Sequence, residues 1–282
     1  MELKNFRFVK FIQLNLEKLI YSIPIYVNTQ ASVINLYNAF INENKISLKD
    51  KSVFESLQQE YIDLDLIYRV GSTLDGGYVM HKIGNEKVAI SIGVGRDVSW
   101  DLAISKLGIM VHMFDHTVAR PPTKFTNSKF HKIGIRSSKT KPSNRLLEFE
   151  GILQKAGCEE LENLILKIDI EGGEWEILEE IESKFLEKFN QIIIEFHDVD
   201  LDDPIKKNVL EKIRLSHSII HINPNNYSKI ISFEGYLYPS ILEVTYVKNK
   251  LLHNTDVKTF SSKTYKNDPR VPSFSNKIFR AK

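Results

Sequence analysis

The chain is poor in cysteine and has no long apolar run. Cys158 is the only cysteine in 282 residues, which excludes an intramolecular disulfide and indicates a reducing compartment. Near the N-terminus, Lys4, Arg7, Lys10 and Lys18 interrupt the apolar residues before a membrane span of about 18 residues can form. This end also lacks a signal-peptide pattern. We therefore expect a cytoplasmic protein without stable membrane insertion.

The chain also lacks a strong net charge. Its 38 Lys and Arg balance 36 Asp and Glu, and no stripe of alternating basic and aromatic residues is present, so we expect no nucleic acid as a partner. Positive charge is concentrated in residues 248–282, which hold nine Lys or Arg and two Asp. This tail is interpreted either as a solvated terminus or as a segment that binds an anionic substrate.

Strand and helix patterns alternate through the middle of the chain. Residues 1–65 are predicted to form a helical extension, with polar residues between the apolar ones, that could mediate homo-oligomer contacts. The sequence Asp75-Gly76-Gly77 predicts a turn. The alternation predicts an α/β fold with a doubly wound, mostly parallel, seven-stranded sheet and helices on both faces, spanning 66–248 and followed by a basic tail at 249–282. Strands are predicted at 87–92, 109–114, 130–135, 164–168, 191–196, 218–222 and 241–247, and helices at 98–107, 144–156, 175–189 and 204–215.

A glycine loop follows the first of these strands. Gly93 and Gly95 allow the backbone to approach a nucleotide closely, as in the Rossmann fold. A dinucleotide site would need a third glycine at position 98, which is a valine here, and this argues against a nicotinamide-dependent oxidoreductase. The loop suits S-adenosylmethionine, which has an adenosine but no phosphate.

An acidic residue, Asp115, follows the second predicted strand. Asp115 lies 20 residues after Gly95, the spacing at which a carboxylate binds ribose hydroxyls. The alternative is an exposed turn at the strand end. With the glycine loop before it, this spacing favours nucleoside binding.

Carboxylates also follow the fourth and fifth strands. Asp169, Glu171 and Glu174 come directly after one, and Glu195 and His197 leave the same face of the other. Because ligands bind beyond the carboxyl ends of parallel strands, we expect Asp169, Glu195 and His197 to meet there. They could act as general bases or hold a divalent metal. The structural alternatives are a capped loop histidine and an ion pair between Glu195 and Lys167.

These motifs together resemble a known family. The series SIGVG, SWDLA, FDHT, LKIDIEGGEWEIL and IIIEFHD, preceded by RVGSTLDGGYV, is similar to the FkbM-type S-adenosylmethionine-dependent methyltransferases, which have the class I fold. The resemblance covers residues 69–247. It implies that the cofactor pocket is lined by Gly93, Gly95, Asp101 and Asp115, with Asp75, Gly77 and Tyr78 near it. It also implies that Asp169, Glu171, Glu195 and His197 face the methyl acceptor. Ser91 stands where many class I methyltransferases carry an acid, and a serine there can bond the amino acid end of the cofactor.

The resemblance implies O-methylation of a small molecule. We expect the acceptor to be a carbohydrate hydroxyl, with the basic tail favouring a nucleotide-activated sugar for capsule or other surface polysaccharide. A polyketide-like acceptor and a non-catalytic nucleotide-binding module of the same fold are the alternatives. Such a hydroxyl needs a base or a metal to release its proton. Asp169, Glu195 and His197 would hold Mn²⁺, Fe²⁺ or Mg²⁺, and without a metal His197 would be the base.

Overall fold

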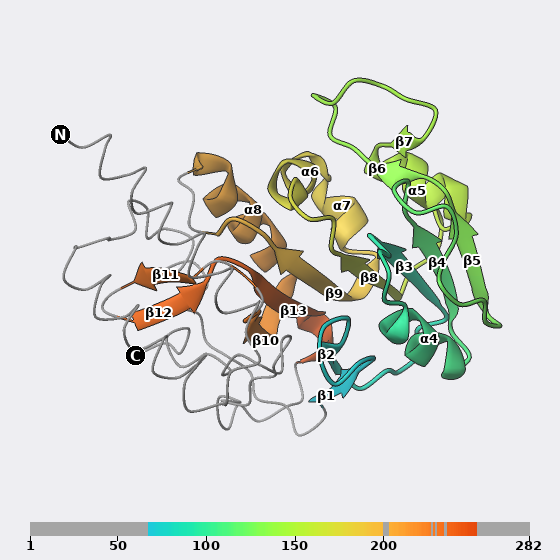
Figure 1. Ribbon diagram of the computed structural model, residues 1–282, viewed down its shortest axis with the longest axis horizontal. Coiled ribbons are helices and arrows are strands. Elements are labelled where there is room, and N and C mark those ends of the chain that lie inside the picture. Colours follow the sequence, from blue (N-terminus) through green and yellow to red (C-terminus); the bar gives the residue numbers. More distant parts are fainter. Residues whose placement is uncertain (1–66, 200–202, 227, 229, 234–235, 253–282) are drawn as a thin grey trace, which may run out of the picture.

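The protein is built around one seven-stranded sheet. The computed structural model describes residues 67–199, 203–226, 228, 230–233 and 236–252. Across the sheet the strand order is β10-β13-β9-β8-β3-β4-β5 (Figure 1). The strands are β3 (Val88–Ile92), β4 (Met110–Phe114), β5 (Ser128–His131), β8 (Leu164–Ile168), β9 (Phe189–Phe196), β10 (His217–Pro224) and β13 (Leu242–Lys248). The predicted mostly parallel α/β sheet is therefore confirmed.

The strand directions place several loops at one edge. The pairs β3–β4, β3–β8, β4–β5 and β8–β9 are parallel, whereas β13 runs antiparallel to both β9 and β10. Ile92 pairs with both Phe114 and Ile168, so β3, β4 and β8 end at the same level. The loops that follow these strands therefore lie side by side, as expected for a ligand-binding edge.

Both faces of the sheet are covered, so most residues of its central strands are buried and apolar. One face packs against helices α5 (Phe149–Ala156), α6 (Glu174–Glu180) and α8 (Pro204–Arg214), which lie on one side of the sheet in Figure 1. The other face packs against α4 (Ser99–Lys106) and the hairpin of β1 (Ile67–Val70) and β2 (Tyr78–His81). Strand residues alternate between the two cores: Leu164 and Leu166 face the first, and Ile165 faces the second. This alternation follows from the two-residue period of a strand.

The β1–β2 hairpin is fixed to the sheet by polar contacts. The buried Gln191 on β9 accepts a hydrogen bond from the His81 amide at 3.0 Å and donates one to the His81 carbonyl at 3.1 Å. In the turn, the Cβ of any residue at position 77 would lie 1.9 Å from the Ser72 carbonyl oxygen, so only glycine fits. The predicted Asp75-Gly76-Gly77 turn is thus confirmed, and it brings Tyr78 to the end of β8.

Three element predictions need correction. The strand predicted at 130–135 divides, because β5 ends at His131 and β6 (Gly134–Ile135) pairs instead with β7 (Leu146–Leu147). For that reason the helix predicted from residue 144 begins only at Phe149. The helix predicted at 175–189 is two helices, α6 and α7 (Ser183–Leu186), and β9 has already begun at Phe189. The Lys212 ammonium ends α6 by donating hydrogen bonds to the carbonyls of Glu179 and Ile181.

The remaining elements are peripheral to the site. They are β11 (Ile230–Phe233), β12 (Tyr236–Pro239) and a short 3₁₀ turn, Asn249–Leu251. Within the part of the chain that the structure describes, no helix has the length and apolar character needed to cross a bilayer. The predicted helical extension at 1–65 lies outside the described residues, as does the basic tail beyond residue 252.

Candidate active site

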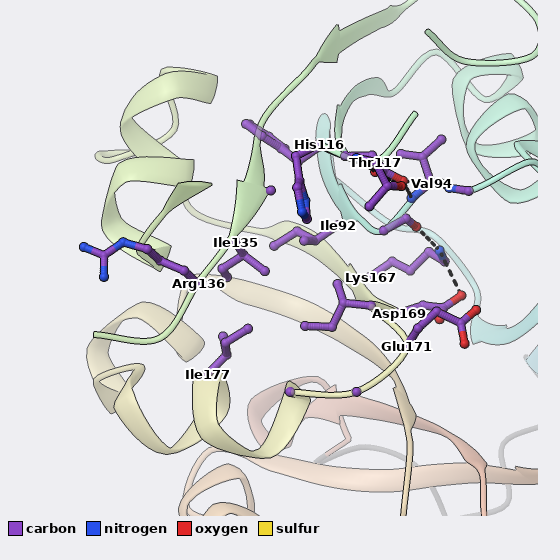
Figure 2. Close-up of a pocket in the computed structure, with 18 of the residues that line it drawn as sticks. Ile92, Val94, His116, Thr117, Ile135, Arg136, Lys167, Asp169, Glu171 and Ile177 are labelled. Carbon is purple, nitrogen blue, oxygen red and sulfur yellow. Dashed lines mark hydrogen bonds and ion pairs between the residues drawn. The ribbon is translucent and has the colours of Figure 1, made fainter. Parts of the chain in front are cut away.

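A cavity of about 490 Å³ opens at the carboxyl ends of β3, β4 and β8. This volume lies within the usual range for small-molecule sites. Figure 2 shows Lys167, Asp169 and Glu171 on one side of the cavity and Ile92, Ile135 and Ile177 on the other. The site therefore offers a polar end and an apolar end to one ligand.

The glycine loop and the loop after β8 touch directly. Gly93 has φ +82°, and a Cβ built on it would lie 1.5 Å from the carbonyl oxygen of Asp169. The buried Lys167 ammonium donates a hydrogen bond to the Gly93 carbonyl at 2.9 Å and lies 3.7 Å from Asp169 Oδ2. Glycine is therefore required at this position so that the two loops can pack together.

Asp115 fixes the glycine loop from the end of β4. Its Oδ2 accepts hydrogen bonds from the amides of Val94 at 3.0 Å and Gly95 at 2.9 Å, and its Oδ1 accepts from the amide and hydroxyl of Thr117. Burial raises the pKa of Asp115, but these hydrogen bonds outweigh burial and hold the pKa below its ordinary value. The four main acceptor positions of the carboxylate are thus occupied. A ribose hydroxyl would have to replace one of these bonds, and the predicted ribose contact stays a prediction.

Two buried polar atoms beside the glycine loop have open hydrogen-bonding capacity. Among the described residues, Asp101 Oδ1 and the Ser91 hydroxyl make no hydrogen bond of normal geometry. Burial raises the pKa of Asp101, against the opposing effects of Lys167 and of the nearby Ser91. Because Asp101 also lines the cavity, its free oxygen can accept a hydrogen bond from a bound ligand.

The loop after β8 has a strained backbone. Glu171, Gly172 and Gly173 all have positive φ, at 60°, 110° and 96°. Such a run is costly for ordinary residues, and it explains the two glycines. Glu174 at the start of α6 stabilises the turn, because its buried Oε1 accepts hydrogen bonds from the amides of Ile170 and Gly172.

The predicted acidic cluster forms where β8 and β9 end. One ligand atom from each of Asp169, Glu195 and His197 lies within 4.8 Å of the others. The Tyr78 hydroxyl donates a hydrogen bond to Asp169 Oδ2 at 2.8 Å and lies 3.5 Å from Glu195 Oε2. Burial, with the charges of Asp169 and Glu195, raises the pKa of Tyr78 well above its ordinary value, so the tyrosine stays a donor.

His197 sits between carboxylates. Its Nδ1 donates to Glu174 Oε1 at 3.0 Å, and its backbone carbonyl accepts from Trp175 Nε1 at 2.8 Å. Burial lowers the pKa of His197, but the hydrogen bond and charge of Glu174, with the charges of Asp169 and Glu171, outweigh burial and raise it to about 8. Beside these carboxylates, His197 is therefore largely protonated at neutral pH.

The structure places most predicted site residues around one cavity. Asp169 and Glu171 line it, whereas Glu195 and His197 adjoin Asp169 without being part of the lining. The predicted cofactor residues that line the cavity are Asp75, Tyr78, Gly93, Gly95, Asp101 and Asp115, and those that do not are Gly77 and Ser91. Their individual roles stay predictions.

The sequence indicates Lys167 only as an alternative ion-pair partner of Glu195, whereas the structure pairs it with Asp169, and it indicates no specific role for Glu174, although both residues hold the site together. Glu174 belongs to a string of three carboxylates, but nothing in that string shows that it bonds His197. Lys167 interrupts an otherwise aliphatic strand, a signal that marks a buried charge with a specific partner. His116 and Arg136 also line the cavity and carry no recognisable motif.

Comparison with known proteins identifies the family. Among curated proteins, none matches the chain significantly. The family model of the methyltransferase FkbM domain matches residues 77–225, which is more than half of the chain and includes the glycine loop, Asp115 and the acidic cluster. The seven-stranded sheet is compatible with a methyltransferase fold. The chain therefore belongs to the FkbM methyltransferase family.

Proposed function

We propose that the protein is an S-adenosylmethionine-dependent O-methyltransferase. The observation that carries this proposal is the position of Asp169, which lines the cavity, contacts the glycine loop and belongs to the acidic cluster. A methyl donor held by the glycine loop and a hydroxyl held at Asp169 would then share one cavity. This is the arrangement that transfer between them requires.

The residues around the cavity fit this cofactor. Ile92, Ile135 and Ile177 offer an apolar surface for a purine ring, and the free Oδ1 of Asp101 can accept a hydrogen bond from an ammonium group. At Gly95, which has φ +56°, a Cβ would have no atom within 4 Å, so the loop leaves room on that side. When bound, S-adenosylmethionine supplies an electrophilic methyl group on a positively charged sulfur.

Methyl transfer to a hydroxyl is an in-line displacement. The acceptor oxygen forms a bond to the methyl carbon while the carbon–sulfur bond breaks, and that electron pair stays on sulfur as the neutral thioether. The hydroxyl proton must leave, and the acidic cluster is where this chain can take it up or promote its loss. Asp169 is positioned for this role by its contacts with Tyr78 and Lys167.

The acceptor we propose is a carbohydrate hydroxyl, in particular that of a nucleotide-activated sugar. Three cationic side chains, Arg96, Arg136 and Lys167, line the cavity, and residues 248–282 carry nine Lys or Arg against two Asp. Because acids outnumber cations in the lining of the cavity, the support for an anionic acceptor comes mainly from the basic residues of 248–282. The carbohydrate itself is proposed from the family resemblance.

The test combines cofactor binding with product analysis. S-adenosylhomocysteine is titrated calorimetrically into the protein, and labelled methyl transfer is then measured on a panel of nucleotide sugars and polyketide-like alcohols. We expect micromolar binding and a methyl group that resists mild alkali, because an ether is stable where a methyl ester is hydrolysed. Asp169→Asn should retain S-adenosylhomocysteine binding and lose turnover.

The matched control is Glu179→Gln, which makes the same change of charge at a partly exposed position of α6, outside the cavity lining, where Glu179 pairs with Lys139 at 3.5 Å. Wild-type turnover in Asp169→Asn would overturn the role of Asp169. Alkali-labile product would overturn hydroxyl methylation, and no binding of S-adenosylhomocysteine would favour the non-catalytic module.

A further inference from the structure

The acidic cluster brings two carboxylates and an imidazole together where β8 and β9 end. Glu195 is buried beside Asp169, and one carboxylate oxygen of each lies within 4.8 Å of the other and of a ring nitrogen of His197. Carboxylates buried close together repel one another unless a cation or a proton lies between them. The cluster is therefore a place where a cation is stabilised.

One atom in the cluster lacks a hydrogen-bonding partner. His197 is only 7% exposed, and its Nε2 makes no hydrogen bond to any described residue. The nearest carboxylate oxygens are Glu171 Oε2 at 3.4 Å and Glu195 Oε1 at 3.7 Å. This nitrogen therefore points into the cluster, with its coordination site directed at the acids.

The other ring nitrogen of His197 is held in the orientation that metal ligands use. Glu174 is fully buried, and its Oε1 lies 3.0 Å from Nδ1 while it also accepts two backbone amide protons. Because that oxygen is an acceptor in all three contacts, Nδ1 carries a proton. A histidine that donates this proton to a carboxylate presents its other nitrogen as a ligand, which is the usual outer-shell pattern around a bound metal.

The spacing also suits a metal ion. Ligands around an octahedral ion at about 2.1 Å lie roughly 3.0 Å apart when adjacent and roughly 4.2 Å apart when opposite. The ligand atoms of Asp169, Glu195 and His197 are at most 4.8 Å apart, so small side-chain rotations bring them to these distances. The set of two carboxylates and one imidazole fits Mg²⁺, Mn²⁺ or Fe²⁺ better than structural zinc, which takes four protein ligands.

We propose that Asp169, Glu195 and His197 bind one divalent cation of this kind, and that Glu174 is a positioning residue that orients His197. Three protein ligands leave coordination positions free, and Asp169 directs the ion toward the cavity. An acceptor hydroxyl bound there would lose its proton more readily, because a cation lowers the pKa of a coordinated oxygen. This catalytic role rests on the proposed function, but the binding of the ion does not.

The test measures Mn²⁺ binding to the chelator-treated full-length protein, without cofactor or acceptor. The electron paramagnetic resonance signal of free Mn²⁺ falls as the ion binds, which gives stoichiometry and Kd directly. We expect one site per chain. Asp169→Asn and His197→Gln should each raise the Kd at least tenfold, and Glu174→Gln should raise it about 10- to 100-fold, the usual effect of losing an outer-shell partner.

Glu179→Gln is the matched control, and its Kd should stay within twofold of wild type. Binding that is absent in wild type, or that Asp169→Asn and His197→Gln leave unchanged, would overturn the proposal. Thermal unfolding of each variant separates a lost ligand from a lost fold, since Asp169 is partly exposed and its amide is nearly the same size. S-adenosylhomocysteine titration of the metal-free protein tests the proposed function separately, so either can fail alone.

Discussion

The contact between the glycine loop and the loop after β8 makes Gly93 the most sensitive position in the site. In Gly93→Ala the new Cβ would start 1.5 Å from the Asp169 carbonyl oxygen, whereas real Cβ contacts essentially never fall below 3.0 Å. The obstacle is backbone, so it cannot rotate away. The two loops must separate, which stretches the hydrogen bond from Lys167 to the Gly93 carbonyl.

The size of the effect follows from two costs. A residue with a side chain at φ +82° costs about 1–2 kcal/mol, and forcing a packed region apart costs about 1–3 kcal/mol more. We therefore expect the free energy of unfolding to fall by about 2–5 kcal/mol. Gly108→Ala isolates the first cost, because Gly108 has the same φ of +82° but nothing within 4 Å of its Cβ.

The assay is urea denaturation followed by tryptophan fluorescence, with S-adenosylhomocysteine affinity measured in parallel. Gly108→Ala should lose only about 1–2 kcal/mol and bind the ligand normally. Gly93→Ala should lose more stability and bind the ligand weakly, because the glycine loop that lines the cavity is displaced. Equal loss of stability in the two variants, at equal denaturant slopes, would refute the reasoning from packing.

Three further predictions concern single side chains. Asp115→Asn should lower the free energy of unfolding by roughly 2–4 kcal/mol in urea titrations and weaken S-adenosylhomocysteine binding, because the carboxylate accepts bonds from the Gly95 amide and its neighbours; a change below about 0.5 kcal/mol would contradict this. Tyr78→Phe should cost about 0.5–1.5 kcal/mol and reduce kcat more than the KM for the cofactor, since it removes the hydrogen bond to Asp169. The third is a pH dependence: burial lowers the pKa of His217 to about 4, so the folded state resists protonation. Stability should be level above the unfolded pKa of about 6.5 and fall by up to about 3 kcal/mol as the pH drops to 4, and His217→Gln should remove that part of the slope.

The sheet could be predicted because its strands carry their own signals. The predicted bounds of β8, Leu164–Ile168, are the observed ones, since five buried residues in a row bounded by polar residues leave little choice. The insertion of β13 between β9 and β10 could not be predicted, because alternation along the chain does not state which strands pair. The break between α6 and α7 could not be predicted either, because the ammonium group that caps the end of α6 belongs to Lys212 on α8.

The acidic cluster could be predicted because ligand sites lie at the carboxyl ends of adjacent parallel strands. Asp169 and Glu195 follow strands that are adjacent and parallel, so topology alone brings them together. The contacts that define their chemistry are of another kind. The bond from Tyr78 to Asp169 joins residues 91 positions apart, and that between His197 and Glu174 joins residues 23 apart, so no local pattern contains them.

The cluster is also hard to explain as a device for stability. Glu195 lies on a fully buried strand with five apolar residues among its other seven, and a leucine there would avoid the cost of a buried carboxylate. Instead the chain supplies Tyr78, Lys167 and Asn225 as partners for Asp169 and Glu195. Even so, Nε2 of His197 is left without a hydrogen bond among the described residues. Folding alone favours neither the acids nor the open nitrogen, and both are accounted for if a cation and an acceptor hydroxyl complete the site.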